Sequence, residues 1–260
     1  MDLVNYFILG VIEGFTEFLP VSSTAHLILI SKILNIQQTD FHKFFEIFIQ
    51  IGAMLAVFLN YFTLIINKKN IIKKIFISLV PTVIIGLIFY KLIKKIFFEN
   101  TVLIIFALFS VGFLFLLVEF LIKHKKIKLE NKLENLNYFQ AFLIGVFQGI
   151  AIVPGVSRAG AVILSMLILK FQREDAVLYS FLLGAPTIFL AGTYDLYKTG
   201  YKSLFLDSNN FFYLIIGFIT SFIFALLSIK WLINYLQKHN LNIFGYYRII
   251  LAIIYLILFS

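Results

Sequence analysis

Long apolar runs, separated by short polar segments rich in lysine, fill most of this sequence. Six of the runs are long enough to cross a membrane as helices, because about 20 apolar residues span the hydrocarbon core of a bilayer. We therefore predict six membrane-spanning helices. They cover residues 44–66, 75–97, 101–122, 175–196, 211–236 and 243–259.

Four further apolar runs are too short to cross, and each lies beside another across a proline-containing break. A helix of about 13 residues is only about 20 Å long. Irregular backbone survives at membrane depth only inside protein or beside a cavity. We therefore predict that the short runs pair as two re-entrant helical hairpins. The runs are residues 3–18 with 22–34, and 138–153 with 157–169.

The two predicted hairpins are similar in sequence, which indicates an internal repeat. Aligned on their glycines, the segments that begin at Gly10 and Gly145 run in register, and Ser22 falls opposite Ser157. Three predicted crossings separate equivalent points, and an odd number of crossings inverts the second copy. The predicted fold class is an all-α polytopic membrane protein with six membrane-spanning helices and two re-entrant helical hairpins in an inverted-topology repeat.

Composition favours an integral membrane protein over a soluble one. Of the 260 residues, 61% are hydrophobic and 13% are charged, whereas soluble domains are about 45–50% apolar and about 25% charged. The start of the chain lacks a basic region and a cleavage site, so we expect no removable signal peptide. We expect a single membrane domain over residues 1–260. Its parts are repeat 1 over about 3–97, repeat 2 over about 138–236, and further spans over 101–122 and 243–259.

The distribution of lysines predicts the orientation in the membrane. The net charge of +9 lies mostly in short loops, which favours membrane topology over nucleic-acid binding as its explanation. Residues 67–74 and 123–137 carry nine of the 19 lysines and fall on one side of the membrane. The positive-inside rule makes that side cytoplasmic, so both termini would face outward from the inner (plasma) membrane.

Ionisable residues within the apolar runs are candidates for chemistry. Glu13 and Glu17 are four residues apart and would share one face of a helix, and Glu46 and Gln50 repeat this spacing. A charge at the bilayer centre costs about 2.5–3.5 kcal/mol, so these carboxylates must pair, bind an ion or line water. Two adjacent carboxylates suit a hard divalent cation, Mg²⁺ or Ca²⁺. The alternative is a purely structural network of ion pairs.

Each hairpin break ends in a serine that starts the next helix, which indicates an anion site. Serine is a good N-cap, and the free N–H groups and dipole of a helix N-terminus attract anions. Ser22 and Ser157 hold these positions, and Ser23 and Thr24 follow the first. Arg158 adds a planar fork of donors that suits a phosphate. Because carboxylates alone would repel a phosphate, a bridging metal is the natural link.

His26 follows Ser22 by four residues and Ser23 by three, so on a helix it would share their face. A serine and a histidine so placed can act as nucleophile and base, or the histidine can protonate a leaving phosphate. The alternative is a histidine that only hydrogen-bonds a neighbouring helix.

Four motifs together resemble the bacterial undecaprenyl-diphosphate phosphatases of the bacitracin-resistance type. The motifs are Glu13-Gly-Phe-Thr-Glu17-Phe-Leu-Pro-Val-Ser-Ser-Thr-Ala-His26, Pro154-Gly-Val-Ser-Arg158, Phe45-Glu46-Ile-Phe-Ile-Gln50 and Phe181-Leu-Leu-Gly-Ala-Pro186. The resemblance covers essentially the whole chain. It implies hydrolysis of undecaprenyl diphosphate to undecaprenyl phosphate and inorganic phosphate, which recycles the lipid carrier of cell-wall synthesis.

The residues and the resemblance together predict the following site. The catalytic residues would be Glu17, Ser23, His26 and Arg158. The substrate-binding residues would be Ser22, Thr24, Ser157, Arg158, Glu46 and Gln50. A divalent cation, Mg²⁺ or Ca²⁺, would be held by Glu13 and Glu17. Ser23 (Ser22 is less favoured) or His26 would attack phosphorus, or His26 would activate water, and these alternatives stay open.

The second motif departs from the family's usual Pro-Gly-x-Ser-Arg-Ser-Gly-Ala-Thr, because Ala159 and Val162 replace the later serine and the threonine. Any hydroxyl role at these positions is absent here. The rival function is a transporter or flippase of polyprenyl phosphate lipids, since inverted repeats with midplane sites are transporter architecture. The glutamate pair and the Ser–His pair favour an enzyme. Expected partners are the polyprenyl diphosphate lipid and the bilayer, with no nucleic acid and with a homodimer left open.

Overall fold

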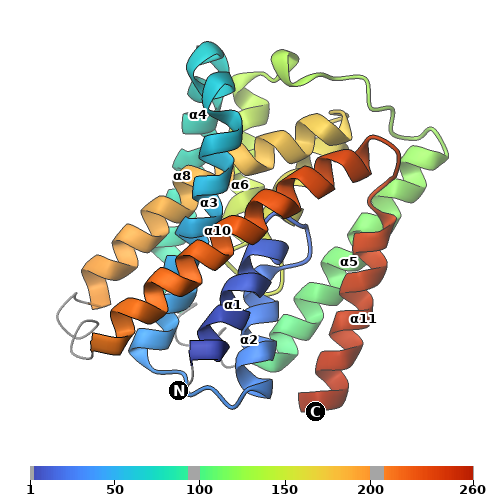
Figure 1. The fold of residues 1–260 in the computed structure, drawn as a ribbon. Helices are drawn as coiled ribbons and strands as arrows, with labels where there is room; N and C mark the ends of the chain where they lie inside the picture. Colours follow the sequence, from blue (N-terminus) through green and yellow to red (C-terminus); the bar gives the residue numbers. More distant parts are fainter. Residues whose placement is uncertain (1–2, 93–99, 200–207, 260) are drawn as a thin grey trace.

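The structure, a computed structural model, describes residues 3–92, 100–199 and 208–259, which fold as helices (Figure 1). Six of these helices are long and apolar enough to cross a membrane. They are α3 (Asp40–Asn67), α4 (Lys69–Leu92), α5 (Thr101–Lys123), α8 (Arg173–Thr199), α10 (Ser208–Leu236) and α11 (Asn242–Phe259). Each covers one predicted span, which confirms a multi-pass helical membrane protein. The end of the span predicted over 75–97 lies outside the described residues.

Four shorter apolar helices occupy the runs that are too short to cross. They are α1 (Leu3–Thr16), α2 (Ser23–Ile33), α6 (Tyr138–Ile150) and α7 (Arg158–Ile168). Helix α1 packs against α2, and α6 packs against α7, so each pair forms a helical hairpin with an irregular segment at its tip. Figure 1 shows both chain termini at the end of the molecule where α1 begins and α2 finishes.

Glycines set how closely the short helices approach the long ones. Helix α1 crosses α10, and a Cβ added at Gly14 would lie 2.5 Å from the Ser221 carbonyl oxygen. Helix α6 crosses α4, where a Cβ at Gly145 would lie 1.9 Å from the Ser78 carbonyl oxygen. Both distances are far inside van der Waals contact, so only glycine allows these crossings, as in other close-packed membrane helices.

Hydroxyl groups then supply the carbonyls of the short helices with donors. The Ser78 hydroxyl on α4 donates to the Ala141 carbonyl at 2.6 Å, and the Ser228 hydroxyl on α10 donates to the Phe15 carbonyl at 2.8 Å. Large apolar side chains face outward on the long helices, where Val102, Phe106 and Ile257 are each at least 70% exposed. Such a surface suits contact with lipid tails.

Residues 124–137 cross the end of the molecule opposite the termini, as Figure 1 shows. They include the short 3₁₀ helix η2 (Leu133–Asn135). Glu134 joins this segment to the start of α4, because its carboxylate accepts from Lys68 at 2.9 Å and its carbonyl accepts from Lys74 at 3.0 Å. The two lysine-rich segments predicted to share a side therefore lie together at one end of the helix bundle.

Candidate active site

The irregular tips of the two hairpins meet at a cavity of about 700 Å³. Helices α3, α4 and α8 complete its wall. Eight of the predicted site residues line this cavity: Glu17, Ser22, Ser23, Thr24, Glu46, Gln50, Ser157 and Arg158. Two predicted site residues, Glu13 and His26, are buried beside the cavity without lining it.

Two serines at matching positions of the hairpins both have a positive φ angle. Ser22 has a φ angle of 73° and Ser157 one of 71°. Positive φ is uncommon for residues other than glycine and is often found at functional sites. The Ser157 hydroxyl accepts from the Gly160 N–H at 3.1 Å, which confirms its role as the N-cap of α7. Ser22 precedes α2 without a side-chain capping bond, so its hydroxyl stays available on the cavity wall.

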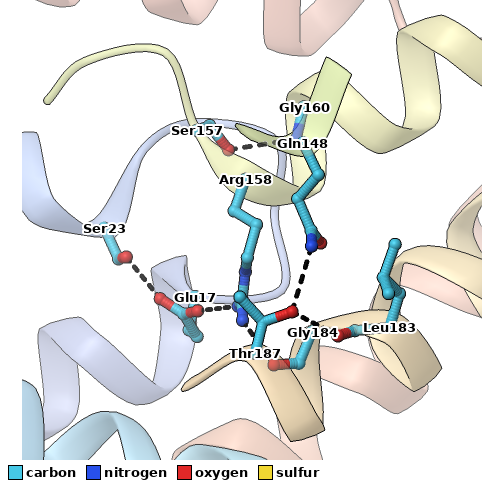
Figure 2. A network of polar contacts seen from close by, with 9 residues as sticks. All are labelled: Glu17, Ser23, Gln148, Ser157, Arg158, Gly160, Leu183, Gly184 and Thr187. Carbon is cyan, nitrogen blue, oxygen red and sulfur yellow. Dashed lines mark hydrogen bonds and ion pairs between the residues drawn. The ribbon is translucent and has the colours of Figure 1, made fainter. Parts of the chain in front are cut away.

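Glu17 joins the two hairpins through a buried network, which Figure 2 shows. Its Oε1 atom accepts from the Arg158 guanidinium, and its Oε2 atom accepts from the Ser23 hydroxyl. Only 6% of the Glu17 side chain and 16% of the Arg158 side chain are exposed. Because each charge would be costly alone at this depth, the pairing stabilises both.

Arg158 is also held by α8. Its Nη1 atom donates to the Gly184 carbonyl at 2.7 Å. A Cβ at Gly184 would lie 3.0 Å from this nitrogen, so the glycine gives the guanidinium room against the helix backbone. The segment Phe181–Pro186, noted in the sequence for its resemblance, therefore orients the arginine of the second hairpin.

Glu13 is fully buried, and neither of its carboxylate oxygens has a hydrogen-bond partner. The Glu17 N–H donates to the Glu13 carbonyl at 2.9 Å, so the helical spacing of the two glutamates is real. The charged groups that act on the Glu13 carboxylate are Glu17, Arg158 and Glu46. Two further carboxylates and one guanidinium therefore act on Glu13, and among the described residues no hydrogen-bond donor reaches its two oxygens.

The donor set around Glu13 fits a hard divalent cation, because its two unpartnered oxygens are of the kind that Mg²⁺ and Ca²⁺ prefer. Among the described residues, no group of three or more His, Cys, Asp or Glu side chains converges on one point. Mg²⁺ commonly binds through one or two carboxylates and completes its shell with water and substrate phosphates. Glu13 and Glu17 meet that requirement.

His26 has partners other than Ser23. Its Nδ1 atom lies 2.7 Å from the Ser22 carbonyl, so this nitrogen donates, and its Nε2 atom lies 2.7 Å from the Tyr247 hydroxyl. The two rings stack with centroids 5.6 Å apart. Within the described residues, the hydroxyl of Ser23 is bonded to Glu17 rather than to His26. The geometry thus offers a carboxylate, and not an imidazole, as the nearest proton acceptor.

Glu46 reaches the cavity from α3 and is held by two residues that the sequence did not single out. Its Oε1 atom lies 3.0 Å from His42 Nε2, and the Ser31 hydroxyl donates to it at 3.3 Å. His42 and Ser31 are both fully buried. Their spacing in the sequence, eleven residues apart on two different helices, gave no signal of this contact.

Gln148 has the position in the sequence of the second hairpin that Glu13 has in the first, and unlike Glu13 it lines the cavity. Its Nε2 atom donates to the hydroxyls of Thr82 at 3.1 Å and Thr187 at 3.0 Å, while its Oε1 atom has no partner. Ala159 and Val162, which replace the family's hydroxyl residues, are packed in the apolar core and do not line the cavity.

Arg248, for which the sequence indicated no role, binds both irregular tips. It is fully buried on α11. Its guanidinium donates to the carbonyls of Pro20 at 3.0 Å, of Val156 at 3.1 Å, and of Gly155. One side chain therefore supplies donors to carbonyls from both hairpins.

Comparisons with known proteins were made for the whole chain. The family model described as bacitracin resistance protein BacA matches residues 6–254. The chain belongs to the BacA family. A relative from Sulfurihydrogenibium sp. (strain YO3AOP1) is 46% identical over 255 residues, and one from Aquifex aeolicus (strain VF5) is 44% identical over 248 residues. These alignments cover 98% and 95% of each chain, respectively, and both relatives are named undecaprenyl-diphosphatase. Membership of the BacA family confirms the resemblance seen in the sequence.

We expect Arg248→Met to lower the melting temperature of the purified protein. Buried carbonyls that lose their donor cost about 1–3 kcal/mol each, so the loss at three carbonyls should lower the melting temperature by at least about 6 °C. Arg248→Lys should recover part of the loss, because an ammonium group still reaches some of these oxygens. Lys230→Met is the control, since Lys230 is exposed on α10 and should change melting by about 2 °C or less. Equal melting of Arg248→Met and wild type would contradict the role of this arginine.

Proposed function

We propose that this BacA-family protein is an undecaprenyl-diphosphatase, which hydrolyses undecaprenyl diphosphate to undecaprenyl phosphate and inorganic phosphate. The family and the names of its relatives support this function. The observation that carries it is the buried network in which Glu17 bonds both Ser23 and Arg158. A hydroxyl nucleophile, a proton acceptor and a phosphate-binding guanidinium are thereby brought to one cavity.

The cavity suits a lipid with a charged head. Its polar residues lie on the hairpin tips, and apolar side chains of α4 and α8 line another part of its wall, including Val83, Leu87 and Leu190. Gly86 lies among them, with only Ile152 near the position of an added Cβ, at 4.0 Å. We place the diphosphate against the tips and the first isoprenyl units against α4 and α8.

The geometry suggests how the chain's own groups perform the transfer. Glu17 accepts the proton of the Ser23 hydroxyl while the Ser23 oxygen attacks the terminal phosphorus of the diphosphate. The new bond to Ser23 forms as the bond to the bridging oxygen breaks, and undecaprenyl phosphate leaves with the electron pair. Glu17 passes its proton to the leaving undecaprenyl phosphate. Water then attacks the phosphoserine and gives a proton to Glu17, the bond between phosphorus and the Ser23 oxygen breaks, and inorganic phosphate leaves. The Ser23 oxygen takes the proton back from Glu17, which restores the resting site. Arg158 and the N–H groups at the starts of α2 and α7 hold the phosphoryl oxygens.

Glu13 and Glu17 would hold the divalent cation in this proposal. When bound, a divalent cation neutralises the diphosphate and stabilises the charge that develops during transfer. His26, which bonds the Ser22 carbonyl and Tyr247, positions the strained turn that carries Ser22 and Ser23.

Phosphate release from farnesyl diphosphate by the detergent-purified protein, with Mg²⁺ present, tests the function. Hydrolysis needs no sealed bilayer, whereas transport or flipping of polyprenyl phosphate lipids does. Release of phosphate in detergent is the expected result. A protein that releases none, yet moves lipid phosphates across vesicle membranes, would favour the rival function.

We also propose that the two hairpins are re-entrant and that the repeats have inverted topology. Three features support the repeat. Helix α1 packs on α10 while α6 packs on α4, close glycines stand at both crossings, and Ser22 and Ser157 both have a positive φ angle. The repeats would be about 3–97 and about 138–236 of one domain.

The lysine-rich end, with residues 67–74 and 123–137, would then be cytoplasmic and both termini would lie outside. Single cysteines at Lys69, Lys126 and Gln37 test this orientation with an impermeant thiol reagent in intact cells. All three positions are exposed. Labelling is expected only at position 37, and labelling at 69 and 126 but not at 37 would reverse the orientation.

A cation requirement is expected from the unpartnered oxygens of Glu13. Chelation should abolish phosphate release, and Mg²⁺ or Ca²⁺ should restore it. Glu13→Gln should raise the Mg²⁺ concentration for half-maximal activity by about tenfold or more, equivalent to ~1.4 kcal/mol. Glu130→Gln, the same change at an exposed position, is the control. Full activity in excess chelator would remove the metal from the mechanism.

Removal of the Ser23 hydroxyl should lower turnover far more than removal of the neighbouring Thr24 hydroxyl. Ser23→Ala should lower turnover by about 10²–10⁴-fold or more, because the nucleophile is lost. Thr24→Ala changes a hydroxyl on the same cavity wall and should cost less than about tenfold. Both turnover rates are measured by phosphate release at saturating farnesyl diphosphate. A Ser23→Ala protein within tenfold of wild type would exclude Ser23 as the nucleophile.

Substitutions at Arg158 distinguish a phosphate-binding role of this residue from a purely structural one. Lysine keeps the charge but loses the planar pair of donors, so Arg158→Lys should fold and lose about 10–100-fold in turnover. Arg158→Ala should lose more. Melting and turnover of both variants in one detergent provide the measurement. Wild-type turnover in Arg158→Lys would mean that the arginine serves only to neutralise Glu17.

A further inference from the structure

A second hollow, which shares no residue with the cavity, lies where three long helices end. It has a volume of about 810 Å³. The last turns of α5, the segment that follows α10 and the first turn of α11 line it, together with Arg173 at the start of α8. Because membrane-spanning helices end near the lipid headgroups, the hollow lies at headgroup depth.

The charge around this hollow is positive. Glu119, a buried carboxylate in its wall, is already satisfied. Arg173 donates to it from Nε at 2.8 Å and from Nη2, and the Leu241 N–H donates at 3.1 Å. Lys123 and Lys238 line the hollow and are exposed, and neither forms an ion pair in the described part of the chain. Two lysine charges are therefore left for a ligand.

The other wall of the hollow is apolar and faces outward. Phe113, Leu117 and Phe120 on α5 line it and are 53%, 39% and 56% exposed. At the end of α10, the ring of Tyr235 stacks on Trp231 and on His239, with centroids 5.2 Å and 4.7 Å apart. Tryptophan and tyrosine gather at the headgroup level of membranes, which agrees with the depth assigned to the hollow.

We propose that this hollow binds the headgroup of an anionic phospholipid. Its phosphate would lie between Lys123 and Lys238, and an acyl chain would run along the exposed apolar side chains of α5. Basic pockets between membrane helices are a recurrent way of binding such lipids. A free phosphate ion shares the headgroup charge but has no use for the apolar wall, so the combination favours a lipid.

Native mass spectrometry and thermal melting of the purified protein test this proposal. The probes are dioleoyl phosphatidylglycerol, dioleoyl phosphatidylcholine with the same chains, and inorganic phosphate. The protein should retain the phosphatidylglycerol and have a higher melting temperature in its presence. The phosphatidylcholine and the inorganic phosphate should have much smaller effects. Lys123→Gln/Lys238→Gln should lose roughly fivefold in affinity for each lysine.

The matched control is Lys125→Gln/Lys126→Gln, which removes the same charge at exposed positions that do not line the hollow. It should bind the anionic lipid as wild type does, and Lys123→Arg/Lys238→Arg should also keep binding. Equal losses in the two glutamine variants would show attraction to overall charge and overturn the site. Equal stabilisation by phosphatidylcholine or by inorganic phosphate would overturn the anionic lipid as its ligand.

Discussion

The contact between Arg248 and the two hairpin tips is the constraint on which the site depends. Irregular backbone inside a membrane protein leaves carbonyls that no water can reach, and each needs a donor. The Arg248 guanidinium gives donors to Pro20 on one tip and to Gly155 and Val156 on the other. These bonds hold the two tips in place, and Ser22, Ser23 and Arg158, which come two or three residues after the bonded carbonyls, line the cavity.

Close packing and buried polar contacts together fix the positions of the two hairpins. Glycine crossings of α1 on α10 and of α6 on α4 fix how deeply each hairpin enters the bundle. The Glu17–Arg158 pair then fixes one tip against the other. The two contributions are complementary. Close packing does not determine which polar groups face each other, and an ion pair alone tolerates small shifts of the helices. Together they hold a hydroxyl, a carboxylate and a guanidinium in one arrangement.

The fold and much of the site could be predicted from the sequence, because the thickness of the membrane and the free-energy cost of burying a charge are strong constraints. Run length alone separated the six long helices from the four short ones. The cost of burying Glu17 and Arg158 indicated that they must pair or bind. Ser23 and His26 do lie three residues apart at the start of α2, as the spacing predicted. The partner of Ser23 could not be predicted, because spacing along one helix does not show which groups of other segments come closer. The chain turns at Ser22 with a positive φ, and this turn brings Ser23 to Glu17 and leaves His26 with Tyr247.

The Glu17–Arg158 pair also affects how tightly any phosphate can be held. In the proposed mechanism, a phosphate that takes the Nη2 donor of Arg158 must displace the Glu17 carboxylate already bonded to it. The measured affinity is then the difference between two ion pairs, not the strength of one. In the proposed mechanism, such an exchange would keep an inorganic phosphate product weakly bound even in a buried site, because Glu17 would recapture the arginine as the product departs. The resting ion pair would thereby compete with phosphate for Arg158 and favour product release.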